Sequence, residues 1–463
     1  MKTIRILLFA LTVVSLTGCK SLYGKYHRPE VTTDGLLRDV TSLTDTLAND
    51  GQQSFGQLPW RQVFTDPQLQ ALIEQGLANN TDLLNAALNV KMIEAQLTAA
   101  KLAFVPGFTF TPQGTIASWD GAKPTKTYSL PVNASWSIDL FGNLLSQKRA
   151  VQMQLLQMKD YQVSVQTAIV ANVANMYYTL LMLDRQLEVV TDMERLTKDT
   201  WDIMQLRKNT TIGIRSTAVQ SAEANYLSVQ TQKTDLKRQI REVENSLSLL
   251  IGQQAQTISR GRLDDQQLPQ QFSAGVGIDL LANRADVHAN EMALAQCFHN
   301  VQTARSRFYP SITINASGAY TNNSGAGIVN PGKILASAVG SLTQPIFQHG
   351  LLVAGLKVAK AQYDQAYNTW QQSILKAGSE VSNALVQYNA SAEKAALEQQ
   401  RIKVLRQNVE DTRLLMASAG STYLEVITAE QSLLNAELNA ISNQFSKMQA
   451  VVDLYNALGG GSR

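Results

Sequence analysis

Cysteine and histidine, the residue types that most often do chemistry, are scarce in this chain, which has two cysteines and four histidines in 463 residues. His27, His288, His299 and His349 show none of the spacings to cysteines or carboxylates that metal sites use. The sequence contains no glycine-rich phosphate loop, and no nucleophile motif stands out among its many serines and threonines. The sequence therefore predicts no enzyme, no metal and no cofactor, so that any energy the protein needs must come from a partner.

Cys19 is the residue whose surroundings do indicate chemistry. Lys2 and Arg5 precede an apolar stretch, Ile6–Leu16, which is too short to span a bilayer and is typical of a secretory signal peptide. The ending Leu16-Thr17-Gly18-Cys19 resembles the bacterial lipobox, and this resemblance implies cleavage before Cys19 and acylation of its thiol. Acyl chains partition into a bilayer at about 0.8 kcal/mol per buried methylene. A plain signal peptide that happens to contain a cysteine is the alternative.

The mature chain is nearly neutral. Removal of residues 1–18 leaves 38 basic against 37 acidic residues, which does not favour a nucleic-acid partner, because such proteins normally present a basic face. Cys297 is then the only other thiol, so no internal disulfide is expected, and we interpret it as a small apolar filler. The mature part also lacks a run of about 18 apolar residues, the length that a membrane-spanning helix needs.

Glycine and proline are distributed unevenly, and their scarcity marks four long blocks. All 11 prolines lie outside these blocks, which predicts very long helices, the longest about 100 Å. Apolar residues inside the blocks alternate steps of three and four, the period of a coiled-coil seam, and the other faces are rich in polar residues. The predicted helices cover residues 143–212, 214–251, 351–419 and 421–458.

Other segments alternate apolar and polar residues with a period of two, which predicts β-strands at Tyr128–Leu140 and Ser311–Tyr320, with weaker partners at Phe108–Ala117 and Ile334–Phe347. Polar loops are expected at 119–126 and 322–333. Strands of about ten residues suit a membrane, although a soluble hairpin has the same pattern. In a membrane, lipid would contact Tyr128, Leu130, Val132, Trp136, Ile138 and Ile314, and water would contact Ser129, Asn133, Ser135, Ser137 and Asn315.

The chain also repeats itself. Leu77–Asp82 matches Leu281–Asp286 at an offset of 204 residues, and Gly213 matches Gly420 at an offset of 207. A nearly constant offset over about 150 residues argues for duplication. We therefore expect a signal peptide at 1–18, a lipidated linker at 19–59, a first repeat at 60–250, a connector at 251–278, a second repeat at 279–458 and a tail at 459–463.

Two strands in each repeat give four predicted strands per chain. Four strands are too few for one chain to close a membrane barrel, which uses at least about eight. An open sheet edge in lipid leaves unpaired N–H and C=O groups that cost several kcal/mol each. If the strands lie in a membrane, the chain must complete its barrel with other copies of itself.

Several segments, weak one by one but joined by order and spacing, resemble the outer-membrane efflux protein family, the TolC-like factors. They span roughly residues 60–458 and are most similar to the lipoprotein branch that serves resistance-nodulation-division pumps. The resemblance implies a mainly α fold with a small β part. It also implies a homotrimer with a twelve-stranded outer-membrane β-barrel and a periplasmic α-barrel of duplicated long-helix coiled-coil hairpins. The segments are Ser137–Gly142, Arg284–Asp286, Phe308–Ser311, Gln344–Gly350, Glu380–Leu385 and Gly420–Glu437.

The same resemblance implies where partners dock and where the tunnel narrows. The hairpin tips at Asn209–Arg215 and Ser418–Tyr423 are expected to meet a periplasmic adaptor protein, and each contains a glycine that permits a turn. The periplasmic aperture is predicted at Leu424, Glu425 and Thr428, where relatives commonly have aspartate in place of Thr428. Glu425 could instead be an ordinary solvated residue. The docking residues are Asn209, Thr211, Gly213, Arg215, Ser418, Gly420, Ser421 and Tyr423.

The resemblance, together with the signal peptide and Cys19, implies a passive exit duct in the outer membrane. The duct would be lipid-anchored, contact outer-membrane lipid, extend into the periplasm and pass small molecules from an inner-membrane pump that it reaches through the adaptor. One alternative is the outer-membrane duct of a type I protein secretion system. Another is a lipid-anchored coiled-coil adhesin or spacer, which explains the long helices and Cys19 but does not require duplicated strand pairs.

Overall fold

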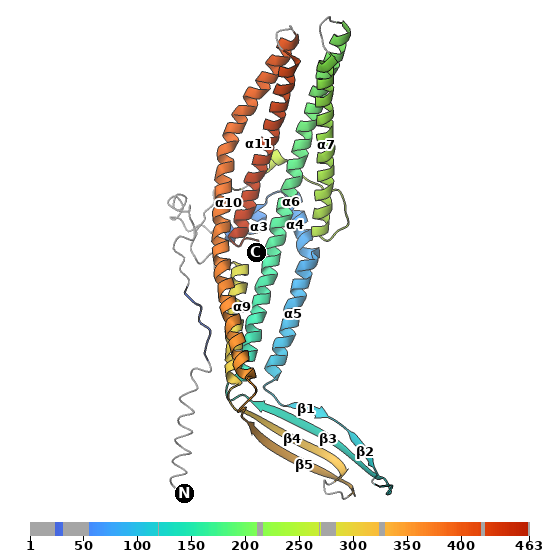
Figure 1. Cartoon of the computed structure of the whole chain (residues 1–463), viewed down its shortest axis with the longest axis vertical. Coiled ribbons are helices and arrows are strands. Elements are labelled where there is room, and N and C mark those ends of the chain that lie inside the picture. The colour runs from blue at the N-terminus through green and yellow to red at the C-terminus, as the bar shows by residue number, and fades with distance from the viewer. Residues whose placement is uncertain are drawn as a thin grey trace. The chain divides into compact units, whose positions relative to one another are not determined.

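The structure of this chain is a computed structural model, which describes residues 24–30, 55–118, 120–210, 216–267, 269, 284–323, 329–417 and 422–461. The described residues are mainly helical, with one antiparallel sheet (Figure 1). They group into two compact units. Unit 1 contains the described parts of 24–30, 87–160 and 288–373, and unit 2 those of 55–86, 161–287 and 374–461.

The blocks without breakers fold as long helices. They are α6 (Asn143–Thr210), α7 (Ser216–Leu250), α10 (Leu351–Ala417) and α11 (Tyr423–Ala457), and each begins and ends within two residues of its predicted block. In unit 2, α6 runs beside α7 and α10 beside α11, so that the helices form two hairpins (Figure 1). None of the helices in the described part of the chain combines the length and apolar character needed to cross a membrane.

Shorter helices precede each long pair. They are η2 (Phe55–Gln57), α3 (Trp60–Val63), α4 (Pro67–Asn79) and α5 (Thr81–Leu102), then η3 (Leu263–Asp265) and α9 (Ala285–Ser306). Asp66 caps α4, because its Oδ1 accepts a hydrogen bond from the Gln68 amide at 2.8 Å and Pro67 occupies the first turn. Asn80 does the same for α5 through the amides of Asp82 and Leu83.

Aromatic side chains fix the end of α11 in the core of unit 2. Tyr455 is buried, and its ring packs edge-on against Phe55 and Phe64 at centroid distances of 5.5 and 5.8 Å. Its hydroxyl donates a hydrogen bond of 2.6 Å to the Leu58 carbonyl. The N-terminal short helices are thereby joined to the last long helix.

The sheet lies in unit 1 and is built from β1 (Gly107–Phe110), β2 (Gln113–Ala117), β3 (Thr125–Ile138), β4 (Ser311–Asn323) and β5 (Val329–Thr343). Its order is β1-β3-β4-β5, with β2 also paired to β3. The single strand predicted at 108–117 is therefore wrong in detail. It is divided at Pro112, which lacks the amide hydrogen that a strand pairing would use.

The other strand bounds also differ from the prediction. β3 begins at Thr125 and ends at Ile138, so that Asp139 and Leu140 lie beyond it. β4 continues to Asn323 and β5 begins at Val329, which makes the loop predicted at 322–333 shorter than expected. The alternation of side chains marks the middle of each strand but not the polar ends, where side chains such as Thr321 and Asn322 also form hydrogen bonds to the neighbouring strand.

The pairing of β3 with β4 separates a polar face from an apolar face, as the period of two predicts. Ser135 lies opposite Asn315, and its Oγ donates a hydrogen bond of 2.9 Å to Asn315 Oδ1. On the other face Trp136 lies opposite Ile314. That apolar face leaves large side chains exposed, namely those of Tyr128, Leu130, Val132, Trp136, Tyr320, Ile334 and Leu342.

A short N-terminal segment, residues 24–30, packs against the helices of unit 1. The ring of Tyr26 contacts that of Phe298 edge-on at 6.0 Å. Arg28 Nη2 lies 3.3 Å from Glu291 Oε2, and the Arg28 guanidinium lies over the ring of Trp370. The segment therefore runs antiparallel to α9.

Candidate functional site at the ends of the helical hairpins

The predicted aperture residues share one exposed face at the start of α11. Leu424, Glu425 and Thr428 are all exposed, whereas Val426 and Ile427 between them are buried. The spacing i, i+1 and i+4 places three residues on one side of a helix. The structure therefore brings the three residues together in a single chain, and their arrangement as rings in an assembly stays a prediction.

Glu425 also has a structural role. Its Oε2 accepts a hydrogen bond of 3.1 Å from the Thr422 amide, and its own amide donates to Thr422 Oγ1 at 3.4 Å. This reciprocal pair is a capping box, which closes the first turn of α11. The interpretation of Glu425 as merely solvated is therefore incomplete, and the spacing Thr-x-x-Glu before an apolar run could have predicted the cap.

Under this face, the ends of the long helices share a small apolar cluster. It includes Met204 of α6, Val219 of α7, Met416 of α10 and Val426 of α11. Tyr423, one of the predicted docking residues, packs against the cluster and is half-buried. Part of the Tyr423 side chain therefore contacts this cluster, and only the exposed part is accessible to a docking partner.

Polar contacts join the two hairpins at the same level. Arg207 Nη1 of α6 donates a hydrogen bond of 2.8 Å to the Met416 carbonyl in α10. Gln431 Nε2 of α11 donates to Asn225 Oδ1 of α7 at 3.1 Å. Separation of the hairpins would break both hydrogen bonds.

Glu430 is a buried acid in this junction. It is 0% exposed, its Oε1 accepts a hydrogen bond of 2.8 Å from Thr200 Oγ1, and its Oε2 has no hydrogen-bond partner among the described residues. Burial raises the pKa of Glu430 to about 7. Glu430 is not among the residues that the sequence predicts for the aperture or the docking tips. Steps of three and four residues from Ile427 through Glu430 to Leu434 place a charge on the apolar seam, and this signal could have found it.

Several predicted site residues cannot be placed. Cys19 lies outside the described residues, as do Thr211, Gly213, Arg215, Ser418, Gly420 and Ser421. Asn209 belongs to the last turn of α6. The lipid anchor and most of the two docking tips therefore remain predictions.

Arg284 joins two of the family-like segments in unit 2. Its Nη2 lies 2.8 Å from Asp286 Oδ2 and its Nη1 lies 2.8 Å from Glu380 Oε2, while Nη1 also donates to the Ala457 carbonyl at 3.0 Å. Burial opposes ionisation of Asp286, yet the hydrogen bonds from Arg284 hold its pKa below the usual range. The segment Arg284–Asp286 is therefore more than a helix start, because it ties α9 to α10 and to the end of α11.

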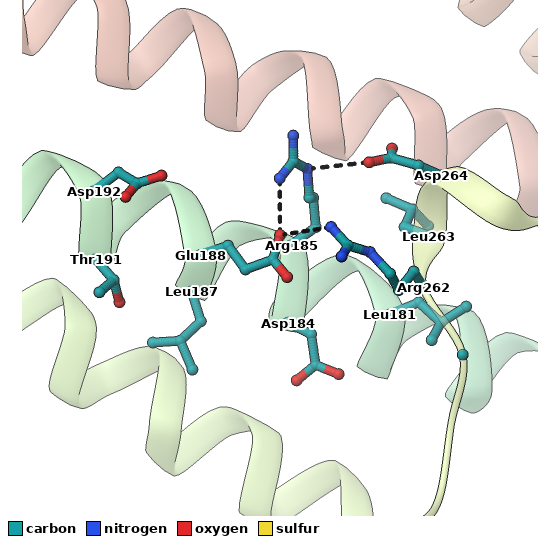
Figure 2. Close-up of a pocket in the computed structure, with 11 residues that line it drawn as sticks. Leu181, Asp184, Arg185, Leu187, Glu188, Thr191, Asp192, Arg262, Leu263 and Asp264 are labelled. Carbon is teal, nitrogen blue, oxygen red and sulfur yellow. Dashed lines mark hydrogen bonds and ion pairs between the residues drawn. The ribbon is translucent and has the colours of Figure 1, made fainter.

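A hollow of 590 Å³ in unit 2 lies between α6 and the connector at residues 261–264 (Figure 2). Its wall charges pair with one another, because Arg185 contacts Glu188 at 2.8 Å and Asp264 at 3.5 Å, and Arg262 contacts Glu188 at 3.6 Å (Figure 2). Among the described residues, no group of three or more His, Cys, Asp or Glu is arranged to hold a metal. We interpret the hollow as part of the attachment of the connector to α6.

Comparison with known proteins defines the class of protein. The family described as "Outer membrane efflux protein" matches residues 72–253 and 278–460. The chain therefore belongs to the outer membrane efflux protein family, as the resemblance in the sequence indicates. It is an outer-membrane protein that serves efflux.

Individual relatives agree with this assignment. The chain is 27% identical to the cation efflux system protein CusC of Escherichia coli, with 97% of each chain covered. It is 25% identical to the probable outer membrane lipoprotein SilC of Salmonella typhimurium, again with 97% of each covered. Its fold is similar to that of the outer-membrane channel OprN, with a TM-score of 0.84, 21% identity, and 95% of this chain and 99% of that one covered. The predicted mainly α fold with a small β part is confirmed.

Proposed function

We propose that this chain is the outer-membrane duct of a tripartite efflux system, a homotrimer that receives small molecules from an inner-membrane pump through a periplasmic adaptor. The observation that carries the proposal is the open sheet with an exposed apolar face in a member of this family. Lipid is the partner that such a face fits. The polar face of the same strands then borders a water-filled passage.

The sheet edges support the trimer. Among the described residues, β1 and β2 pair only with β3, and β5 pairs only with β4. Unpaired backbone groups in lipid cost several kcal/mol each, and membrane barrels need at least about eight strands. Because β1 and β2 lie end to end along the same side of β3, the sheet has four strand positions, and three copies supply the twelve that the family resemblance implies.

The N-terminal segment supports a lipid anchor at Cys19. Gly24 lies against Phe298 and Gln302, near the end of α9 that leads into β4. The chain between Cys19 and Gly24 spans at most about 17 Å, so an acyl chain on Cys19 stays near the end of unit 1 that bears the strands. We expect Cys19→Ser to weaken membrane targeting, and intact-mass analysis that found Cys19 unmodified would contradict the anchor.

Bilayer recordings on the purified full-length protein test the channel directly. A duct gives stable conductance steps, whereas a lipid-anchored coiled-coil spacer gives none. Val132→Arg, on the apolar face, should cost roughly 2–4 kcal/mol and reduce the recovery of trimers from the outer membrane. Asn133→Arg, the neighbour on the polar face, is the matched control and should have little effect. Equal losses in both variants would contradict this orientation of the sheet.

Docking at the hairpin tips needs a test in cells. A photo-crosslinker at Asn209 or at Ser418 should capture the adaptor, and one at the exposed Lys237 of α7 should not. Bulky substitutions at the tips should abolish efflux while trimers persist. Capture from neither tip would leave the tips as plain periplasmic turns.

The nature of the cargo separates the two transport alternatives. CusC is described as a cation efflux system protein, which supports small cargo for this chain as well. A strain without this chain should accumulate a small toxic solute. If the strain instead kept normal solute levels and failed to release a protein, type I secretion would be the function.

A further inference from the structure

We propose that Glu430 and Thr200 form a proton-sensitive latch between the two helical hairpins of each chain, and that loss of the proton from Glu430 favours separation of the hairpins and opening of the aperture. The latch rests on the proposed function, because it assigns a regulation to the aperture at the start of α11. Its physical basis lies in the junction within unit 2 and concerns a single chain.

The latch connects elements that belong to different hairpins. Thr200 lies on α6 and Glu430 on α11, and the hydrogen bond between Thr200 Oγ1 and Glu430 Oε1 is 2.8 Å long. Thr200 is 1% exposed and Glu430 is 0% exposed, so water has no access to the bond in the packed state. Glu430 lies two residues beyond Thr428, the last of the predicted aperture residues, on the opposite side of the helix.

The charged groups near Glu430 do not offset its burial. Arg413 of α10 favours ionisation of Glu430, Asp199 of α6 opposes it more weakly, and burial is the largest influence. On the side of α7 the neighbouring contact is the uncharged Asn225, which already accepts a hydrogen bond from Gln431. Glu430 Oε2 has no hydrogen-bond partner within the described ranges.

The protonated and ionised states therefore have different costs. A neutral carboxyl is tolerated in a closed junction. An ionised carboxylate loses its hydration there, and its one hydrogen bond does not compensate for that loss. Burial raises the pKa of Glu430 from 4.5 to about 7. The packed junction thus binds the proton more tightly than the separated state does, and its stability falls as pH rises from about 4.5 to about 7. Above about pH 7 the junction has lost all of the stability that the proton provides. Water can then hydrate the Glu430 carboxylate only if α6 and α11 move apart.

The first hairpin contains a natural control. Glu223 of α7 is the repeat equivalent of Glu430, 207 residues earlier, and it is half-exposed. A solvated carboxylate pays no such cost. Glu223→Gln should therefore leave the pH response unchanged.

Single-channel recordings across a range from about pH 5 to about pH 9 test the latch. The wild-type trimer should spend more time open as pH rises, with a midpoint near the pKa. Glu430→Gln imitates the protonated state, and it should stay in the low-conductance state throughout. Thr200→Val removes a hydrogen bond that favours the ionised form, so its midpoint should move to higher pH. A merely structural role for Thr200 would weaken the junction at every pH without moving the midpoint.

A distance measurement keeps the latch separate from the channel function. Spin labels at Lys198 of α6 and Asn435 of α11, both exposed, report the separation of the hairpins in the full-length Cys297→Ser protein. The distance should increase with pH in the wild-type background and stay constant with Glu430→Gln. A distance that changes in a protein without conductance supports the latch and contradicts the channel. The latch is overturned if the protein conducts but neither the distance between the labels nor the open time changes with pH. It is also overturned if both change equally in Glu430→Gln.

Discussion

The two helical hairpins of this chain match one another in sequence at an offset of 207 residues, yet their ends are built differently. Ala218 of α7 and Glu425 of α11 occupy equivalent positions, 207 residues apart. Ala218 is buried in the apolar cluster, whereas Glu425 is exposed and closes a capping box. Glu223 and Glu430 are also equivalent, and of these two Glu430 is buried and Glu223 is not.

The difference lies in how much of each helix is buried. On α7 the buried residues begin Ala218, Val219 and Ala222, whereas on α11 they include Val426, Ile427, Ala429 and Glu430. Val426 and Ala429 are equivalent to Val219 and Ala222 and are buried like them, but the equivalents of Ile427 and Glu430 are exposed or half-exposed. Both hairpins therefore keep long helices, while the wider buried face of α11 places the Glu430 carboxyl in the junction between the hairpins.

The largest expected effect tests whether α11 buries a wider face than α7. Ile427 is 7% exposed, and its repeat equivalent, Gln220, is exposed. Ile427→Ala should cost about 2–5 kcal/mol, because it removes a buried side chain and leaves a cavity. Gln220→Ala should change stability by less than about 0.5 kcal/mol. Thermal melting of the helical circular-dichroism signal measures both, and equal shifts would show that the two helices bury the same face.

The long helices could be predicted closely from the sequence, because glycine and proline are scarce inside them and apolar residues recur there at steps of three and four. The bounds of α6 and α11 differ from the predicted blocks by two residues or fewer. Strand middles could be predicted from side-chain alternation. The break at Pro112 does not appear in that alternation, because it comes from the missing amide hydrogen of proline and not from the polarity of a side chain.

The parts of the candidate site that depend on tertiary packing could not be predicted in the same way. The exposed face with Leu424, Glu425 and Thr428 follows from helix geometry alone. The burial of Glu430 depends on how α11 is rotated against α6, and the ion pairs of Arg284 depend on Glu380, which lies 96 residues later. Such contacts between distant segments leave no periodic signal in a single sequence.

A smaller effect should come from the capping box at the start of α11. Thr422→Ala removes the acceptor for the Glu425 amide, which should cost about 0.5–2 kcal/mol and loosen the first turn of α11. Hydrogen exchange in that turn should accelerate, while exchange at the start of α7 stays the same. Ser221→Ala, at an exposed position of α7, is the control. Unchanged exchange in Thr422→Ala would mean that packing of Tyr423 alone holds the turn.

The smallest effect concerns charge at the aperture, where the two roles of Glu425 can be separated. Glutamine serves as well as glutamate in a capping box, so Glu425→Gln keeps the first turn intact and removes only the charge. If three copies bring Glu425 together, the carboxylates attract cations, as acidic rings do in cation-selective pores. We expect Glu425→Gln to shift the reversal potential toward lower cation selectivity and to weaken block by divalent or trivalent cations from the periplasmic side.

Thr428→Asp provides the opposite change on the same face, since Thr428 is exposed and lies one turn from Leu424. It should strengthen both cation selectivity and block, whereas Ser221→Asp, the equivalent change in the first hairpin, should alter neither. Single-channel recordings in a salt gradient compare the three variants. Because the cap survives in Glu425→Gln, a change in selectivity there cannot be attributed to unfolding of the turn. Identical reversal potentials and block in Glu425→Gln and Thr428→Asp would place this face of α11 away from the narrowest part of the tunnel, and the difference between the hairpins would then be structural alone.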